Sequence, residues 1–572
     1  MSVSDRPQTR RPQSTVAAVT PAPTRAQRTW LAGPTSGVLL FFAFPPVERS
    51  FLVWVALVPL LSLVTSPSRP RTAYLSAWLG GLIFWVASLH WIMELHPAAW
   101  LAWMALALYQ SVYWPLFLAA ARLLVKRGIP LVAAAPVAWV ACEYVQAHAL
   151  SGFPWFYLAH SQYKALSLIQ VSDLAGAWGV SLLIVLVNAW ILVVARAAIT
   201  HAANPRAIPK AVLWPTLATV AALGATLVYG SFRLSEAKHF QTGPRVLLLQ
   251  SNMRQEMKMS LSADDIIRMF ANLIRAAFEG EAAGGVDLVV WPETSYPTGW
   301  VRIEQNAGVP ALEAAGRALV PQMTLRDWLD RRAEGRAELN AWSRELRCPM
   351  LVGLPTYTLT SAGGYKANGV AWIDGTGAEP AIYEKMHLVP FGEYIPFMDQ
   401  MPWMKKLAPY DEDRVPKLRA GRAPVWFDHH NVRYAAAICF EDTLPHLVRR
   451  FYREAPDGKQ PDILVNMSND GWFNGSAEHE MHLAIGVFRC VENRTPLIRS
   501  ANMGYTAIVD GNGDIVRALR KKTEATLTHR VPLDPRQSVY SQFGDWLPQL
   551  CLIGIGCAAV AAFIRRVRGR PA

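Results

Sequence analysis

Long apolar runs without charged residues dominate the first 235 residues of the chain and return once near its end. A helix that crosses the roughly 30 Å hydrocarbon core of a bilayer needs about 20 mostly apolar residues. The pattern predicts eight transmembrane helices, at residues 30–46, 51–66, 74–95, 98–121, 129–147, 174–195, 211–232 and 546–564. A buried core helix is the alternative for any single run, but so many runs together indicate a polytopic membrane protein.

These runs divide the chain into four parts. We expect a disordered basic tail at residues 1–28, a membrane domain with seven transmembrane helices at 29–235, a polar domain at 243–535, and a C-terminal transmembrane helix at 546–564. The spans at 30–46 and 129–147 give the weakest signals, because the first is short and the second contains Glu143. At 572 residues with 52% hydrophobic content, the chain exceeds one ordinary soluble domain.

Basic residues predict how the chain is oriented. They concentrate in the N-terminal tail, in the loops after the second, fourth and sixth spans, and at the C-terminus: Arg6, Arg10, Arg11, Arg25, Arg28, Arg69, Arg71, Lys126, Arg127, Arg196, Arg206, Lys210, Arg565, Arg566, Arg568 and Arg570. Loops rich in Lys and Arg stay in the cytoplasm. Residues 243–535 are therefore predicted on the periplasmic side of a bacterial inner membrane. Because these segments largely explain the net charge of +13, no nucleic-acid binding is expected.

Between residues 243 and 535 the pattern changes to short apolar runs separated by charged segments. The runs at 246–249, 288–291, 350–354, 370–373, 434–438 and 463–465 are typical of buried strands, and residues 263–279 and 324–347 are typical of helices. This alternation favours a layered α/β domain, although periodicity alone does not select one α/β arrangement over another.

The cysteines give no sign of a disulfide framework or a metal site. Three of the six lie in predicted spans, and no Cys-x-x-Cys spacing occurs. His479 and His482 are three residues apart, without a further ligand pattern around them. We expect no metal and no cofactor.

Three short motifs carry the candidate chemistry, and each follows a strand-like run. Trp-Pro-Glu ends at Glu293, Tyr-Glu-Lys ends at Lys385 and leads into Leu-Val-Pro-Phe-Gly-Glu, and Ile-Cys-Phe-Glu-Asp contains Cys439. A carboxylate, an ammonium and a thiol are the parts of a thiol acyl-transfer site. Taken singly, a strand cysteine is usually a small core residue, and a lone Glu or Lys is usually a surface residue. The interpretation therefore depends on the motifs and their order.

The order Glu, Lys, Cys and the surrounding motifs resemble the nitrilase superfamily. With membrane spans on both sides they resemble its membrane-embedded branch, the apolipoprotein N-acyltransferase family, over nearly the whole chain. The resemblance implies an αββα sandwich for residues 243–535. It also implies that Cys439 is the nucleophile, Glu293 the general base and Lys385 the group that stabilises the oxyanion.

Further positions match the family pattern less completely. Glu393 and Glu441 correspond to supporting glutamates, and Glu393 is alternatively a group that tunes the pKa values of the triad. Phe440, Met259 and Trp472 are predicted on the substrate side. Phe440 stands where a Tyr is often found, and Met259 stands near an expected Trp.

The membrane half carries its own matches to the family. Glu143 and the sequence Gly-Phe-Pro-Trp at residues 152–155 resemble a family loop, whereas Gln146 replaces a usual Arg, and His479 replaces a Pro further along the chain. Residues Phe397 to Arg414 form either a lid that dips into the membrane interface or a surface loop, and the sequence does not decide between them.

The resemblance implies a two-step transfer. A phospholipid would donate an acyl chain to Cys439, and the thioester would then acylate the α-amine of the N-terminal diacylglyceryl-Cys of apolipoproteins, the last step of lipoprotein maturation, with ping-pong kinetics and a monomeric enzyme. The first alternative is a membrane-tethered amidase acting on a small amide. A transporter or lipid-binding scaffold is the second, and the scarcity of charges inside the spans disfavours it.

Overall fold

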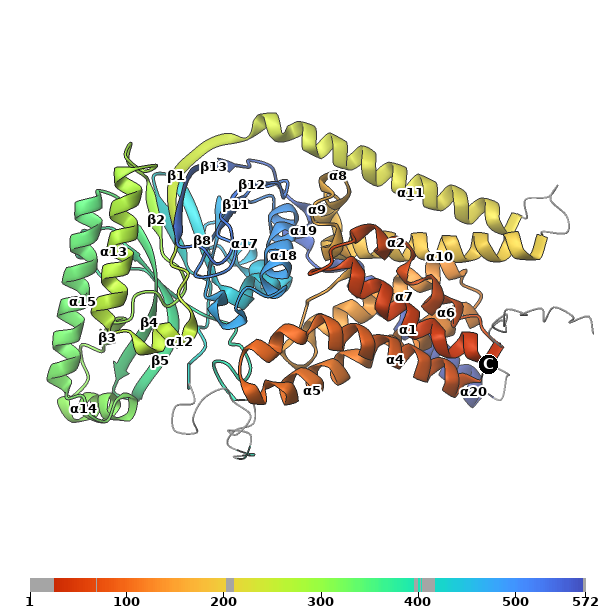
Figure 1. Cartoon of the computed structure of the whole chain (residues 1–572), viewed down its shortest axis with the longest axis horizontal. Coiled ribbons are helices and arrows are strands. Elements are labelled where there is room, and N and C mark those ends of the chain that lie inside the picture. The colour runs from red at the N-terminus through yellow and green to blue at the C-terminus, as the bar shows by residue number, and fades with distance from the viewer. Residues whose placement is uncertain are drawn as a thin grey trace, which may run out of the picture.

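The computed structural model describes residues 25–67, 69–201, 210–395, 400–401, 403 and 417–568. Most of the predicted tail and most of the segment from Phe397 to Arg414 lie outside these residues. Figure 1 shows a helical domain beside a domain built on β-sheets, with the long helix α11 (Lys210–Ser235) leading from one into the other.

The helical domain comprises the helices before β1 together with the last helix of the chain. Their bounds are α1 (Arg25–Ala43), α2 (Val53–Ala56), α3 (Val58–Ser62), α4 (Pro70–Ser88), α5 (Trp100–Ser111), α6 (Tyr113–Lys126), α7 (Leu131–His148), α8 (Leu166–Ile169), α9 (Ser172–Ala175), α10 (Ala177–His201), α11 and α20 (Trp546–Val567). α1 and α4 pack with their backbones in contact, since a Cβ on Gly33 would lie 1.8 Å from the carbonyl oxygen of Ser76. Small residues at helix contacts allow this close approach in membrane proteins.

Among the described residues, four helical stretches are long and apolar enough to cross a membrane: Trp100–Lys126, Ala177–Ile199, Val212–His239 and Trp546–Val567. The predicted span at 51–66 corresponds to a shorter apolar helical stretch, Ser50–Ser62, which consists of the 3-10 turn Ser50–Leu52 and the short helices α2 and α3. The helix predicted from residue 174 starts at Ala177, after Gly176 takes a left-handed φ of +67° that ends α9. The count of eight spans stays a prediction.

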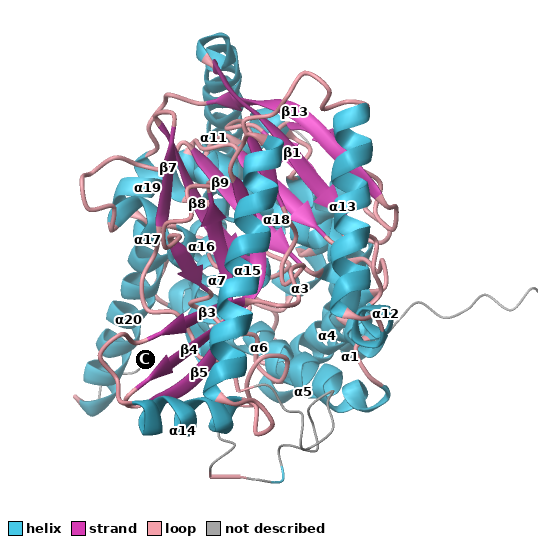
Figure 2. Ribbon diagram, turned by 90° about the vertical axis from the view of Figure 1, so that its left-hand side faces the viewer, coloured by secondary structure: helices cyan, strands magenta, loops and turns pink. Residues whose placement is uncertain are grey.

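Two β-sheets form the centre of the second domain, as Figure 2 shows. In the described residues one sheet has seven strands in the order β13-β1-β2-β4-β5-β6, with β3 paired to β4, and the other has six in the order β12-β11-β10-β9-β8-β7. Strand bounds are β1 (Gln241–Gln250), β2 (Leu288–Val290), β3 (Trp300–Ile303), β4 (Met350–Thr360), β5 (Gly363–Ile373), β6 (Ile382–Glu384), β7 (Trp426–His429), β8 (Val432–Ile438), β9 (Ile463–Ser468), β10 (Leu497–Ala501), β11 (Ala507–Val509), β12 (Ile515–Ala518) and β13 (Ala525–Leu533).

The two sheets pack face to face, and helices cover their outer faces. Leu247 and Leu249 of β1 belong to a core with α13 (Ala263–Glu279) and α15 (Leu325–Leu346), whereas Val246 and Leu248 belong to the core shared with the second sheet. Successive strand residues point to opposite faces, which explains this division. α14 (Val309–Leu319) also covers the first sheet, and α18 (Glu478–Asn493) contacts β10 of the second. The four layers confirm the predicted αββα sandwich.

Buried charges join the two domains. Arg494, just after α18, donates hydrogen bonds to the Asp173 carboxylate at 2.6 and 2.9 Å and to Gln170 at 2.6 Å. Arg233 of α11 reaches the same carboxylate at 2.8 Å. Separating the domains would leave Arg494 without its carboxylate partner, and an uncompensated buried charge is strongly destabilising. The sheet domain is therefore fixed in its position beside the helical domain.

Candidate active site

The three predicted motifs come together at the ends of strands from both sheets. Glu293 follows β2, Lys385 follows β6, and Cys439 follows β8. Lys385 Nζ lies 3.4 Å from Glu293 Oε1. The charges of Glu293 and Lys385 both act on the Cys439 thiol. Residues that are 146 positions apart in sequence thus form one cluster.

The Glu293 carboxylate is held from two sides. Asn368 Nδ2 donates a hydrogen bond to Oε1 at 2.7 Å, and the backbone N–H of Asn469 donates one to Oε2 at 2.8 Å. Gly353 of β4 permits this placement, because a Cβ there would lie 2.2 Å from the carbonyl oxygen of Pro292. The side chain is 8% exposed, so its orientation is fixed before any substrate arrives.

Lys385 is buried between two carboxylates. Its Nζ lies 2.9 Å from Glu393 Oε1, and Glu393 Oε2 accepts a hydrogen bond from Val389 N at 2.8 Å. Burial opposes the charged form, but Glu393 and Glu293 outweigh it and raise the pKa of Lys385 above its usual value. A lysine that stays protonated suits stabilisation of an oxyanion and does not suit the role of a base.

Cys439 sits at a sharp corner of the backbone. Its φ is +51°, a left-handed value that non-glycine residues adopt at some cost, and its carbonyl oxygen accepts a hydrogen bond from Asn466 Nδ2 at 3.0 Å. Burial raises the pKa of the Cys439 thiol to about 12, and Glu293 adds to the rise, while Lys385 opposes it. The thiol is therefore neutral in the free protein and needs a base to become a nucleophile.

Glu441 ties the cysteine strand to the lysine segment. Its carboxylate accepts hydrogen bonds from the backbone N–H groups of Ile438 at 2.7 Å, Met386 at 2.7 Å and His387 at 3.0 Å, and from the Tyr383 hydroxyl at 2.8 Å. Burial raises the pKa of Glu441 to about 7, although these donors oppose the rise. The arrangement fits the supporting role predicted for Glu441.

Comparison with known proteins matches both domains to one family. The profile of the apolipoprotein N-acyltransferase N-terminal domain matches residues 36–190, and the carbon-nitrogen hydrolase profile matches residues 248–540. An apolipoprotein N-acyltransferase of Geobacter metallireducens is 31% identical over 552 residues, covering 94% of this chain and 96% of the relative. The chain belongs to the apolipoprotein N-acyltransferase family.

A second relative agrees with the family assignment, and a solved structure is too distant to bear on it. An apolipoprotein N-acyltransferase of Rhodopirellula baltica is 29% identical over 563 residues, covering 90% of this chain and 94% of the relative. Among solved structures, an amidase from Nesterenkonia sp. matches 53% of this chain and 93% of its own length at 14% identity with a TM-score of 0.35, which carries no functional argument. As a member of the N-acyltransferase family, the chain is a membrane acyltransferase.

Of the three predicted substrate-side residues of this N-acyltransferase, Phe440 lies where the two domains meet. The Phe440 ring stacks on Trp155 of the helical domain at 6.5 Å with an 11° interplanar angle, and on His387 at 5.9 Å. Trp472 is half-buried in the 3-10 turn Asp470–Phe473. Met259 belongs to α12 (Gln255–Ser260), but its side chain lies outside the described residues.

A buried polar network behind Cys439 was not predicted as a unit. His482 Nε2 lies 2.8 Å from Asp442 Oδ1, and Arg499 pairs with Asp470 at 2.8 Å and with Asn466 Oδ1 at 2.8 Å. Burial and Arg499 oppose the charged form of His482, but Asp442 outweighs them and raises its pKa. Asp442 ends the Ile-Cys-Phe-Glu-Asp motif, but the sequence did not show that it pairs with His482.

Asp470, Glu478 and His479 place ligand atoms within 4.8 Å of one another. The Asp470 carboxylate already pairs with Arg499, so this cluster gives no reason to revise the expectation of a metal-free enzyme.

Two functional neighbours of Glu293 were missed in the sequence. Asn368, a polar residue inside the apolar strand β5, contacts both Glu293 and Glu393 Oε1, the latter at 3.2 Å. Lys258 of α12 donates a hydrogen bond to Thr294 Oγ1 at 2.8 Å. Burial lowers the pKa of Lys258 to about 8, and Glu293 partly opposes that shift. Only Asn368 gave a signal in the sequence, because a polar residue within a buried strand indicates a buried hydrogen-bond partner.

Replacing Lys258 by Met is expected to raise the thermal stability of the detergent-purified protein at pH 7. The pKa of this lysine falls from 10.5 to about 8 on folding, so folding at neutral pH includes the cost of a buried ammonium. Between these values the unfolded chain binds more protons, and the wild-type free energy of unfolding therefore rises with pH. The advantage of K258M in Tm should shrink from pH 7 to pH 10. An advantage that is absent at pH 7 or does not change with pH would contradict this account.

Proposed function

We propose that Cys439 carries an acyl chain between a phospholipid and a lipoprotein. Glu293 takes the thiol proton, and Sγ attacks the ester carbonyl of the phospholipid. The tetrahedral oxyanion is stabilised by the ammonium of Lys385. As the ester C–O bond breaks, Glu293 returns the proton to the leaving oxygen, which releases a lysophospholipid and leaves a thioester on Cys439.

In the second step the acceptor is the free α-amine of an N-terminal diacylglyceryl-Cys. Its nitrogen attacks the thioester carbonyl, Glu293 accepts the amine proton, and the C–S bond breaks to restore the thiol. The products are an amide-linked acyl chain and the free enzyme. Because the donor product leaves before the acceptor reacts, the kinetics should be ping-pong.

The single observation that supports this function most strongly is the cluster of Glu293, Lys385 and Cys439 beside an aromatic contact with the helical domain. The thiol has a pKa of about 12, so it depends on a base. Two hydrogen-bond donors orient the Glu293 carboxylate for that role. Phe440, the neighbour of the nucleophile, stacks on Trp155 of the helical domain. A site at this junction can receive lipid-anchored substrates without extracting either from the bilayer.

The orientation of the chain supports a periplasmic site. Figure 1 places the end of α10, the start of α11 and the end of α20 at the side of the helical domain that lies away from the sheets. These helix ends carry Arg or Lys residues, which favour the cytoplasm. The sheet domain would then face the periplasm, where the outer leaflet supplies both lipid substrates. We propose that the enzyme acts there as a monomer.

The direct test uses purified enzyme, a phospholipid, and a synthetic peptide that carries an N-terminal diacylglyceryl-Cys. We expect an increase in peptide mass by one acyl chain, and an N-acetylated peptide with the same sequence should stay unmodified. Release of ammonia from small amides without any peptide acylation would favour the membrane-tethered amidase and contradict the proposal.

A further inference from the structure

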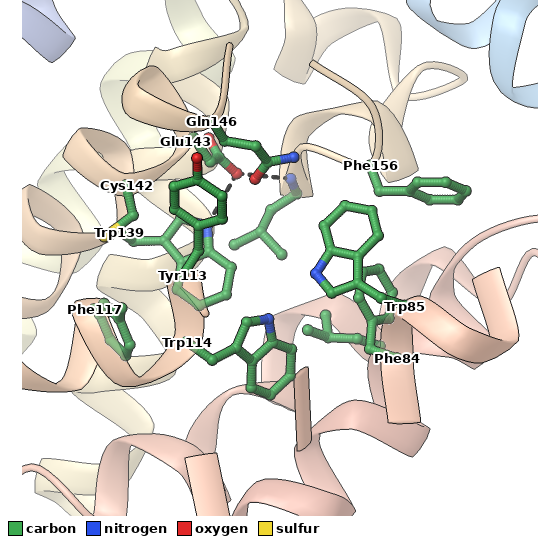
Figure 3. A pocket seen from close by; sticks show the side chains of 12 residues that line it. Phe84, Trp85, Tyr113, Trp114, Phe117, Trp139, Cys142, Glu143, Gln146 and Phe156 are labelled. Atoms are coloured by element: carbon green, nitrogen blue, oxygen red, sulfur yellow. Dashed lines mark hydrogen bonds between the residues drawn. The ribbon is translucent and has the colours of Figure 1, made fainter. Parts of the chain in front are cut away.

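A cavity in the helical domain has none of the triad residues in its lining. It lies between α1, α4, α6, α7 and the segment after α7, and about 440 Å³ of space there, part of it open to the solvent, is not filled by protein atoms. Most of its lining is aromatic: Phe84, Trp85, Tyr113, Trp114, Phe117, Trp139 and Phe156. Figure 3 shows these rings gathered around the space beside Glu143 and Gln146 of α7.

One carboxylate oxygen in this aromatic lining lacks a partner. Glu143 is 5% exposed, and its Oε1 accepts hydrogen bonds from Trp139 Nε1 at 2.9 Å, Leu158 N at 3.1 Å and Ser181 Oγ at 3.2 Å. All three donors converge on this one oxygen, which acts as the acceptor of each hydrogen bond. The other oxygen, Oε2, is buried and has no hydrogen-bond partner among the described residues. A buried polar atom that is left unpaired costs free energy, so a ligand that donates to Oε2 would be favoured.

The same lining contains an unpaired donor. The indole Nε1 of Trp85, which is 3% exposed, also has no partner in the described part of the chain. The cavity therefore offers one unpaired carboxyl oxygen, which a bound cation would keep ionised, and one unpaired neutral donor within aromatic walls. Aromatic faces attract cations, and sites for alkylammonium groups are built from such rings.

We propose that this cavity binds an organic ammonium group with an oxygen acceptor close to it. The ammonium would donate to Glu143 Oε2 and lie against the aromatic rings, and the oxygen would accept from Trp85 Nε1. The inference rests on the proposed function for the source of the ligand. Two substrates have this chemistry: the head group of a zwitterionic phospholipid, with its phosphate, and the N-terminal Cys of the acceptor, with its peptide carbonyl.

The cavity lies close to the reacting centre. Glu143 is five residues before His148, which ends α7 and stacks on His446 of the sheet domain at 4.6 Å. Gln146 Nε2 donates to the carbonyl oxygens of Phe153 at 3.0 Å and Trp155 at 3.2 Å. Since Trp155 stacks on Phe440 beside the nucleophile, the rings of Trp155 and Phe440 lie between the cavity wall and Cys439. A lipid whose head group is held in the cavity would extend past these rings to bring its ester to Cys439, whereas an acceptor amine held there would have to leave the cavity before it attacks the thioester.

The test uses full-length enzyme in detergent and the variant E143Q. Gln keeps an oxygen for the donors on Oε1 and removes the charge at the unpaired position, so the fold should be retained. The matched control is E94Q, which makes the same chemical change at an exposed carboxylate of the helical domain.

The first arm measures the rate of thioester formation with phosphatidylethanolamine, phosphatidylcholine and phosphatidylglycerol that carry identical acyl chains. If the ligand is the lipid head group, wild type and E94Q should prefer phosphatidylethanolamine, whose ammonium has N–H donors, over the other two lipids, and E143Q should lose about tenfold of that preference, which corresponds to about 1.4 kcal/mol. The second arm starts from preformed thioester and measures the KM for the diacylglyceryl peptide. If the ligand is the acceptor, this KM should rise in E143Q and stay unchanged in E94Q.

A binding measurement keeps the inference testable without turnover. Methylammonium chloride, which keeps N–H donors, should raise the Tm of wild type and E94Q more than that of E143Q when each is compared with sodium chloride at equal concentration. The inference is overturned if E143Q matches wild type in head-group preference, in KM for the peptide and in this Tm shift. If no lipid forms a thioester with wild type while the Tm shift depends on Glu143, the proposed function fails and the ammonium site stands.

Discussion

Replacing Glu293 by Gln should lower the rate of thioester formation by about 10² to 10⁴, the range typical for loss of a positioned general base. Cys439 depends on this base because burial raises the pKa of its thiol to about 12. Gln is isosteric, so the hydrogen bond from Asn368 to the side-chain oxygen can be kept. The loss should appear in the rate constant of a single turnover with phospholipid in excess.

The control for this substitution is E279Q, which makes the same change at an exposed position at the end of α13. It should leave the single-turnover rate unchanged. The pH dependence of the rate gives a second test, because without the base only the fraction of Cys439 that loses its proton to water can react. The residual rate of E293Q should increase steadily toward high pH. An E293Q rate within threefold of wild type would show that another group deprotonates Cys439.

Replacing Lys385 by Met should lower the same rate by about 10² to 10³, as expected when one group that stabilises an oxyanion is removed. It should also lower the Tm. The Lys385 ammonium is 1% exposed and lies between Glu293 at 3.4 Å and Glu393 at 2.9 Å. Its removal leaves two buried carboxylates close together without a cation, an arrangement that is strongly destabilising.

Because Lys385 pairs with Glu393, a double variant can separate the effect of K385M on the Tm from its effect on the rate. E393Q combined with K385M should recover part of the lost Tm, because one of the repelling charges is gone, but it should recover none of the rate. K417M, at an exposed lysine, is the matched control and should change neither quantity. A K385M variant with a wild-type rate would exclude Lys385 from the oxyanion site.

Much of the sheet domain could be predicted from the sequence, because its strands are buried and its helices amphipathic. The runs at 246–249 and 434–438 lie within β1 and β8, and the helix predicted at 263–279 is α13. The three motifs were recognisable because each directly follows a strand-like run, and the side chains at strand ends of a sandwich can reach a substrate. Their meeting across the two sheets came from the family resemblance, since spacing along the chain does not show which strand ends meet.

The helical domain was harder to predict. Hydropathy reports only how apolar a run is. The run at 51–66 therefore gives no sign that it forms short helices that pack against α1 and α10. Partners of buried polar groups were also beyond the sequence: Asn368 reaches Glu293 from a strand 75 residues away. The unpaired oxygen of Glu143 is a property of three-dimensional packing.

The most direct test of the account is intact-mass spectrometry of the purified protein after incubation with phospholipid and without acceptor. We expect the addition of one fatty-acyl group, located on the Cys439 peptide and removed by hydroxylamine, as a thioester requires. C439S should carry no hydroxylamine-labile group. A wild-type protein that acylates the diacylglyceryl peptide without ever carrying this adduct, or a labile adduct that persists in C439S, would contradict covalent transfer through Cys439.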